Sequence, residues 1–314
     1  MIIHLKTILC AIDFSQFTPQ MVHYGVGLAK MVGARLLIFH SVNYPEDELY
    51  ASPAAEHGIE LRKMGQRADQ KIKQIMKPYD VDWMSAITQG DPVEKVSQVA
   101  QREDVDLVMA VSHNISGLKR LLMGTVVERM ARGLAFPFLV IRPKKRFKIF
   151  VNEKSFSLKK MVVGCDLSSE ISPALEYARY FARFFNAEIH LLHTMESPVN
   201  EDIVDRTEGS YGEVQQRLRQ RIYDRLLNLC ADKGDSDLTF KIVLETGLPE
   251  EALSRYARQQ SADLMIVGLK RHGALEKILV GSTTEAVIRH SPCPVLVVPP
   301  DVAPKKRFRR VKGS

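Results

Sequence analysis

An internal repeat limits the folds open to this chain more than any other feature of its sequence. Segments of the first half recur in the same order in the second half, offset by 157 residues for most of them and by 153 residues near the front. An insertion in one loop or helix would account for the difference. The matched segments, first half before second, are Asp13 and Asp166, His40 and His193, Gly90-Asp91-Pro92 and Gly247-Leu248-Pro249, Asp106-Leu107-Val108 and Asp263-Leu264-Met265, Gly124-Thr125 and Gly281-Ser282, and Pro137-Phe138-Leu139-Val140 and Pro294-Val295-Leu296-Val297. The chain is therefore predicted to contain two copies of one domain.

Within each copy, short runs rich in β-branched residues alternate with longer helical stretches, which is typical of βαβ units. The predicted strands are 7–12, 35–40, 82–88, 106–111 and 138–142 in the first copy, and 161–165, 188–193, 239–245, 263–268 and 295–298 in the second. The helices predicted for the first copy are 18–32, a long one within 54–77, 93–102 and 126–132. The strands are almost continuously apolar, as expected when helices cover both faces. The predicted fold class is α/β, with two tandem open parallel five-stranded sheets and helices on both faces.

The charge is unevenly distributed along the chain. The whole chain carries +7, but residues 142–160 hold eight basic residues and one acid, and residues 305–314 hold six basic residues and no acid. The remainder is net acidic, which argues against a broad nucleic-acid-binding face. We predict domains at 1–143 and 159–300, a basic linker at 144–158 and a basic, solubilising tail at 301–314.

Composition predicts a soluble cytoplasmic protein. Hydrophobic residues make up 45% of the chain and charged residues 26%, and no apolar run approaches the ~18 residues of a membrane span. The four cysteines are scattered without metal-ligand spacing. Free thiols in a reducing compartment are the simplest interpretation.

The second copy carries the residues with the clearest chemistry. In open α/β sheets, ligands bind beyond the carboxyl ends of the strands where the strand order reverses. The first strand of this copy leads to Asp166, and the fourth ends at Gly268, followed by a basic loop that reaches Gly281-Ser282 at the start of the last helix. Backbone N–H groups, the helix dipole and the Ser282 hydroxyl would favour a phosphate there, and the Asp166 carboxylate can accept bonds from ribose or adenine.

With these residues the chain resembles the universal stress protein family, twice and over nearly its whole length. Nucleotide-binding members carry Gly-x-x-Gly, nine residues and then Gly-Ser/Thr; the second copy has Gly268-Leu269-Lys270-Arg271, nine residues and Gly281-Ser282. The resemblance implies an adenine-nucleotide α-hydrolase-like fold and ATP or AMP as ligand, with Mg²⁺ at most as its companion and no dedicated metal site. It implies no catalytic residues, and at most weak ATPase activity. The ligand positions it implies are Asp166, Thr194, Gly268, Arg271, Gly281, Ser282 and Thr284 in the second copy, and Asp13, Ser41, Asn114, Gly124 and Thr125 in a degenerate first-copy site.

Two departures from the family pattern limit this expectation. Arg271 stands where the family has its second glycine, and it can either supply a charged contact to phosphate or obstruct the site. The first copy has Val111 and Asn114 where both glycines are expected, so nucleotide binding is predicted mainly for the second copy.

Other interpretations of the same residues stay open. Gly281-Ser282 can simply cap a helix, and His40 and His193 are expected to pack at strand ends rather than to act as bases. A nucleotide-independent scaffold is the main alternative function. An adenylating enzyme is disfavoured because Asp13-Phe14-Ser15-Gln16 and Asp166-Leu167-Ser168-Ser169 occupy the place of its Ser-Gly-Gly loop.

The last strand of each copy is an apolar edge that needs covering. We therefore expect the copies to pair through 138–142 and 295–298 as an internal pseudo-dimer. A further homodimer of chains is a weaker expectation.

Overall fold

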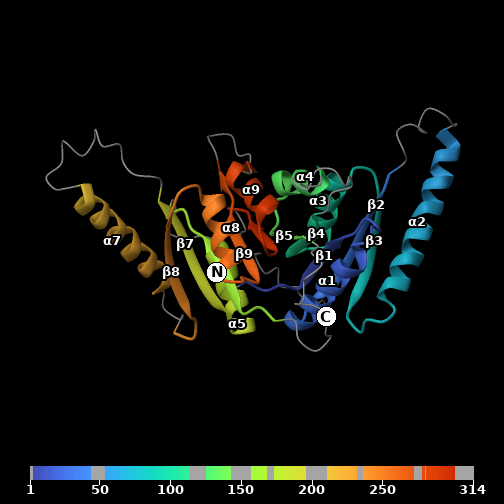
Figure 1. Ribbon diagram of the computed structural model, residues 1–314. Helices are drawn as coiled ribbons and strands as arrows, with labels where there is room; N and C mark the ends of the chain where they lie inside the picture. The colour runs from blue at the N-terminus through green and yellow to red at the C-terminus, as the bar shows by residue number, and fades with distance from the viewer. Residues whose placement is uncertain are drawn as a thin grey trace, which may run out of the picture.

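The computed structural model describes residues 3–43, 54–112, 125–142, 157–167, 173–195, 211–231, 236–271, 278–279 and 281–300. Their centre is one ten-stranded sheet with the order β3-β2-β1-β4-β5-β12-β9-β6-β7-β8 (Figure 1). The first half of the chain supplies the five adjacent strands from β3 to β5 in this order, and the second half supplies the five from β12 to β8. None of the helices in these ranges is long and apolar enough to cross a membrane.

The two halves contain matching elements. Those of the first half are β1 (Thr7–Ala11), α1 (Thr18–Val32), β2 (Arg35–Val42), α2 (Ala54–Met76), β3 (Trp83–Gln89), α3 (Pro92–Arg102), β4 (Leu107–Val111), α4 (Thr125–Gly133) and β5 (Phe138–Ile141). Those of the second half are β6 (Lys160–Gly164), α5 (Pro173–Phe185), β7 (Glu188–Met195), α7 (Tyr211–Cys230), β8 (Phe240–Thr246), α8 (Pro249–Gln259), β9 (Leu264–Gly268), β10 (Lys270–Arg271), β11 (Ile278–Leu279), α9 (Ser282–His290) and β12 (Val295–Val298). The predicted α/β class with tandem parallel sheets is confirmed.

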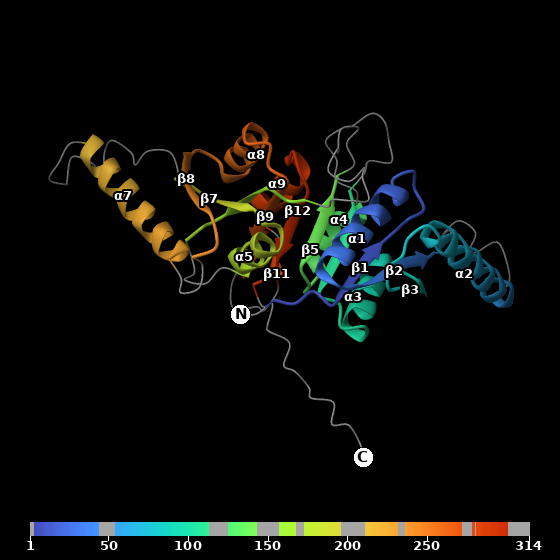
Figure 2. The ribbon, with the colours of Figure 1, turned by 90° about the horizontal axis from the view of Figure 1, so that it is seen from below.

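Alternating side chains of the strands build two apolar cores. Ile8 and Cys10 of β1 belong to the core formed with α1, α2, α5 and α7, whereas Leu9 belongs to the core formed with α3, α4, α8 and α9. Seen from below, helices lie on both faces of the sheet (Figure 2). The inner strands such as β4 and β12 are buried from both sides, which explains why their sequences are continuously apolar, whereas the outer strands β3 and β8 are only partly buried.

The halves join through their last strands, as the sequence predicts. β5 and β12 are antiparallel, with Leu139 opposite Leu296 and Phe138 opposite Val297. The pairing merges the two expected five-stranded sheets into one, so neither final strand is left as an open edge. At the same seam, Arg132 of α4 forms an ion pair of 2.7 Å with Glu285 of α9.

Two buried tyrosines at matching positions, Tyr24 and Tyr177, each interact with charged groups of the opposite half. Burial raises the pKa of Tyr24 in α1, and the charges of Cys293 and Asp263 in the second half raise it further. Burial likewise raises the pKa of Tyr177 in α5, with Asp106 of the first half adding to the effect. Each half therefore completes the core of the other.

The repeat also appears in the backbone. The Asp106 carboxylate accepts bonds from the N–H groups of Lys6 and Thr7, and Asp263 accepts the equivalent bonds from Lys159 and Lys160. These repeated aspartates fasten the start of each half's first strand to its fourth. Their recurrence in the sequence thus has a structural cause.

The matching helices α3 and α8 begin differently: a side chain caps α3, whereas none caps α8. Asp91 accepts bonds from the N–H groups of Val93 and Glu94 and pairs with Arg129 at 2.8 Å, whereas its counterpart Leu248 makes no side-chain cap on α8. The Arg129 hydrogen bond, followed by the backbone bond from Glu94, lowers the pKa of Asp91. The carboxylate therefore stabilises the fold above its unfolded pKa, and this contribution disappears as the pH falls through its lowered folded value.

Asp91→Ala should accordingly lower the free energy of unfolding by about 0.5–2 kcal/mol at neutral pH. The difference from wild type should shrink as the pH falls below about 4, where the carboxyl protonates. Urea titrations at several pH values measure this. Leu248→Asn should add a cap to α8 and act in the opposite direction; a pH-independent cost of Asp91→Ala would contradict the assignment.

Candidate functional site

The reversal of strand order in the second half lies between β6 and β9. These strands are direct neighbours, with Val163 opposite Ile266, so their carboxyl ends open at the same edge of the sheet. Asp166 follows β6, and Gly268 is the last residue of β9; both are exposed. The structure thus brings together the two strand ends that the sequence singles out.

The N-terminus of α9 is the feature of the last helix that the sequence singles out. Gly281 is the N-cap with extended backbone, and no side chain caps the helix. The first N–H groups of any α-helix lack intrahelical partners, and the helix dipole favours negative charge there. A side chain built at Gly281 would meet nothing within 4 Å in the described structure, so this glycine borders open space.

The three hydroxyl residues predicted to contact a ligand in the second half differ in their exposure to solvent. Thr194 is half-buried on β7, and Ser282 is exposed at the first turn of α9. Thr284 is buried, at 7% exposure. Its hydroxyl is therefore less accessible to a ligand than that of Ser282.

The basic loop after β9 contains regular structure where a loop was expected. Lys270 and Arg271 form β10, which pairs antiparallel with β11, so that Arg271 lies opposite Ile278. The backbone of Arg271 is thereby fixed, while its side chain lies outside the described structure. The basic loop is thus closed near its two ends by a short hairpin, which was not predicted from the sequence.

The first-half positions are engaged by the protein itself. The exposed carboxylate of Asp13 accepts a 2.9 Å bond from the N–H of Ser15, and the Ser41 hydroxyl donates a 2.6 Å bond to the carbonyl of Gly90. Val111 ends β4 where Gly268 ends β9. Thr125 begins α4 without a described side chain, and Asn114 and Gly124 lie outside the described residues.

Sequence reasoning missed a feature next to each aspartate. Phe14 and Leu167 both have a φ of 57°, in the left-handed region that bulky residues rarely adopt. Strained backbone of this kind clusters at functional sites. Neither residue type signals a left-handed turn, so only the matched positions after Asp13 and Asp166 could have indicated it.

The two repeated histidines are structural, as expected. His40 Nδ1 lies 2.9 Å from the carbonyl oxygen of Ile12, and His193 Nδ1 lies 2.7 Å from that of Cys165. Burial lowers the pKa of His40. Each ring therefore ties its half's second strand to the end of the first. Within the described ranges, no three His, Cys, Asp or Glu side chains gather in a metal-binding group.

Comparison with known proteins agrees with this architecture. The model of the universal stress protein family matches residues 4–142 and again residues 157–299. Among curated relatives from Methanocaldococcus jannaschii, universal stress protein MJ0531 is 28% identical over 45% of this chain and 81% of its own length. MJ0577 is 28% identical over 46% of this chain and 96% of its own length. Each of these relatives corresponds to one half.

Solved structures match the chain as a whole. A universal stress protein from Archaeoglobus fulgidus superposes with a TM-score of 0.67 at 19% identity, covering 94% of this chain and 97% of its own. A putative universal stress protein from Pseudomonas aeruginosa superposes with a TM-score of 0.64 at 16% identity, covering 95% of this chain and 94% of its own. At these identities the likeness concerns the fold, including its two tandem domains.

The chain therefore belongs to the universal stress protein family, a stress-response class, and carries two of its domains.

Proposed function

We propose that the protein is a cytoplasmic, non-catalytic stress-response protein that binds an adenine nucleotide, ATP or AMP, in its second domain. The open N-terminus of α9, adjoining the exposed end of β9, is the observation that carries this proposal. Phosphates would meet the first N–H groups of α9 and the Ser282 hydroxyl, while Asp166 would accept bonds from the nucleoside. Mg²⁺ would enter with the phosphates; the described part of the chain holds no group of three or more His, Cys, Asp or Glu side chains for it.

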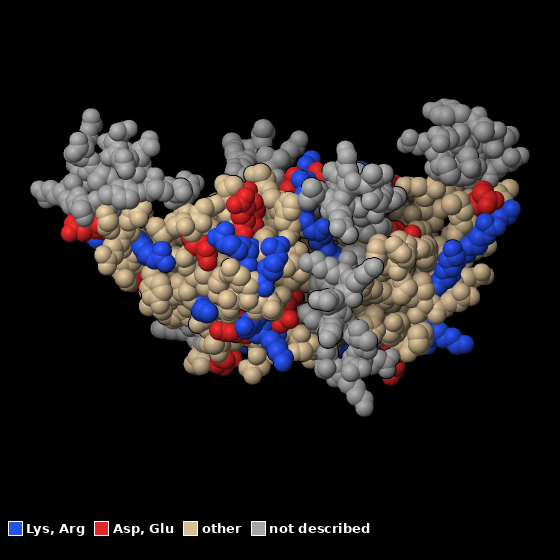
Figure 3. Space-filling view, in the orientation of Figure 1, with Lys and Arg blue, Asp and Glu red and all other residues tan. Residues whose placement is uncertain are grey.

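The domain limits in this proposal are 1–143 and 159–300. The basic segments 144–158 and 301–314 connect and follow these domains in the sequence. Charged residues of both signs are interspersed over the described part of the face seen in Figure 3, so this face shows no broad basic surface of the kind that nucleic acids require. Association of two chains into a homodimer is a further part of the proposal, which sedimentation would test.

Arg271 provides the first test. If its guanidinium contacts a phosphate in place of the missing glycine, Arg271→Ala removes a charge-assisted bond and weakens ATP binding about tenfold or more. Isothermal titration calorimetry at low salt measures this, because phosphate contacts are least screened there. Arg271→Gly separates contact from obstruction, since it restores the family residue.

Tighter binding by both variants would show that Arg271 obstructs the site. ATP and AMP binding by no variant, wild type included, would overturn the proposed function and favour the nucleotide-independent scaffold.

A further inference from the structure

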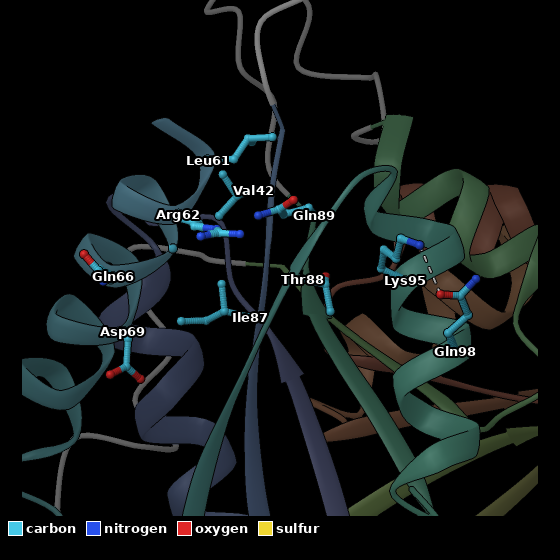
Figure 4. Close-up of a pocket in the computed structure, with 11 residues that line it drawn as sticks. Val42, Leu61, Arg62, Gln66, Asp69, Ile87, Thr88, Gln89, Lys95 and Gln98 are labelled. Carbon is cyan, nitrogen blue, oxygen red and sulfur yellow. Dashed lines mark hydrogen bonds between the residues drawn. The ribbon is translucent and has the colours of Figure 1, made fainter. Parts of the chain in front are cut away.

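A groove in the described structure lies away from the proposed nucleotide site. It has a volume of about 690 Å³ and runs over the carboxyl end of β3, the outermost strand of the first half, between α2 and α3. This volume falls within the range of small-molecule pockets, roughly 300–1,000 Å³. Figure 4 shows the side chains of Arg62 and Gln89 directed toward each other above Ile87, with Lys95 and Gln98 on the other side of the strand.

The groove has two cations, Arg62 and Lys95, and one carboxylate, which is already paired within the protein. Its one carboxylate, Asp69, is already held by Lys73 at 2.6 Å and by the Ser85 hydroxyl, and these bonds lower its pKa. Lys95 lies 3.1 Å from the Gln98 carbonyl oxygen and 3.7 Å from the exposed Glu94. Within the described part of the chain, Arg62 has no ion pair.

Glycine at position 65 keeps the groove open. A methyl group built there would lie 3.8 Å from Ile87 Cγ2, so a longer side chain at this position would extend over the floor of the groove. Gly65 has Arg219 as its counterpart when α2 and α7 are aligned on their fully buried Ile72 and Leu226. Arg219 reaches back to the carbonyl oxygen of Leu244, at 3.5 Å.

The second half has different residues at the other matched positions of this groove as well. The counterparts of Arg62 and Lys95 are Gln216 and Ala252, so both cations are absent. The counterparts of Thr88 and Gln98 are Glu245 and Arg255, which pair with each other at 2.9 Å. Among the matched positions that the structure describes, the glycine and the two cations of this groove therefore occur in the first half and not in the second.

From these contacts we infer that the first domain binds a small organic anion in the groove over β3. Arg62 on the α2 wall and Lys95 on the α3 wall attract its phosphate, carboxylate or sulfonate group, and Val42 and Ile87 contact its apolar part. This site is independent of the proposed nucleotide site, and it gives the first domain a ligand of its own.

Trp83 allows binding to be measured locally. It is the chain's single tryptophan and begins β3, so it lies roughly 13 Å from Ile87 along the strand. The probe is anilinonaphthalene sulfonate, an aromatic sulfonate, and its neutral analogue N-phenylnaphthylamine shows what the charge contributes. Energy transfer from Trp83 reports binding at this end of the molecule, and Trp83→Phe gives the background.

We expect the sulfonate to bind at least about tenfold more tightly than the neutral analogue. Arg62→Gln and Lys95→Ala, which introduce the second-half residues, should each remove most of that difference. Gly65→Arg should abolish the transfer for both probes. Arg221→Gln, the same change at an exposed position of α7, should leave it unchanged.

Three results would overturn the inference: no transfer above the Trp83→Phe background, equal affinity for the two probes, or the same loss in Arg221→Gln as in Arg62→Gln. Circular dichroism of each variant separates loss of the groove from loss of the fold. Saturating ATP should not displace the probe, which distinguishes this groove from the nucleotide site.

Discussion

Leu296→Ala should lower the free energy of unfolding by about 2–5 kcal/mol, the usual cost of removing a fully buried leucine side chain. Leu296 is fully buried at the centre of β12, between Leu139 of the first half and Ile266 of the second. The apolar space around it is lined by residues of both halves, among them Tyr24 and Phe181. The cavity therefore opens where the domains meet, and both should lose stability together.

Trp83 reports on the first domain alone, because it lies on the outermost strand of that half. In urea, the transition seen by Trp83 fluorescence should shift as far as the transition seen by circular dichroism. Leu37→Ala, at a fully buried position inside the first half, is the matched control. It must lower the urea midpoint of the Trp83 transition whether or not the halves unfold together. If Leu296→Ala leaves the Trp83 midpoint unchanged, the halves unfold independently and the shared sheet is not a cooperative unit.

Much of the fold could be predicted because the local pattern and the tertiary structure agree. The helix predicted at 18–32 is α1 with the same bounds, and the strand predicted at 295–298 is β12. The strand predicted at 35–40 extends to Val42 because Ser41 and Val42 pair with Thr88 and Gln89. That extension depends on a neighbouring strand, which local sequence does not reveal.

The candidate site could be located from sequence only in outline. In the second half, Asp166 and Gly268 mark the strand ends, and the strand order places β6 and β9 side by side. The left-handed backbone of Phe14 and Leu167 contradicts residue preference, so no local signal predicted it. The groove over β3 depends on how α2 sits against the sheet and on Gly65, a residue that alone suggests nothing.

Gly281→Val should abolish binding of ATP and AMP. The glycine is the N-cap of α9, and the valine side chain would project into the open space where the proposal places the phosphates. The backbone there has a φ of −69°, which valine adopts without strain, and the described protein offers no atom within 4 Å for it to collide with. Valine is a poorer N-cap than glycine, so the variant should lose roughly 1 kcal/mol of stability, which thermal unfolding measures separately from binding.

Gly124→Val is the matched control, because Gly124 is the first-half counterpart of Gly281 in the sequence repeat. It should leave nucleotide affinity largely unchanged, since the first copy lacks both early glycines and Val111 ends β4. Calorimetry of both variants, with thermal unfolding measured in parallel, decides the matter. Equal losses in the two variants would show that the first-half site is not degenerate.

The number of nucleotides bound per chain tests the asymmetry of the two domains most directly. Equilibrium dialysis of the full chain against radiolabelled ATP, at low salt and with Mg²⁺ present, gives this number without any substitution. One ATP per chain is the predicted result, bound at the edge formed by β6, β9 and α9. Two ATP per chain, or none, would contradict the account.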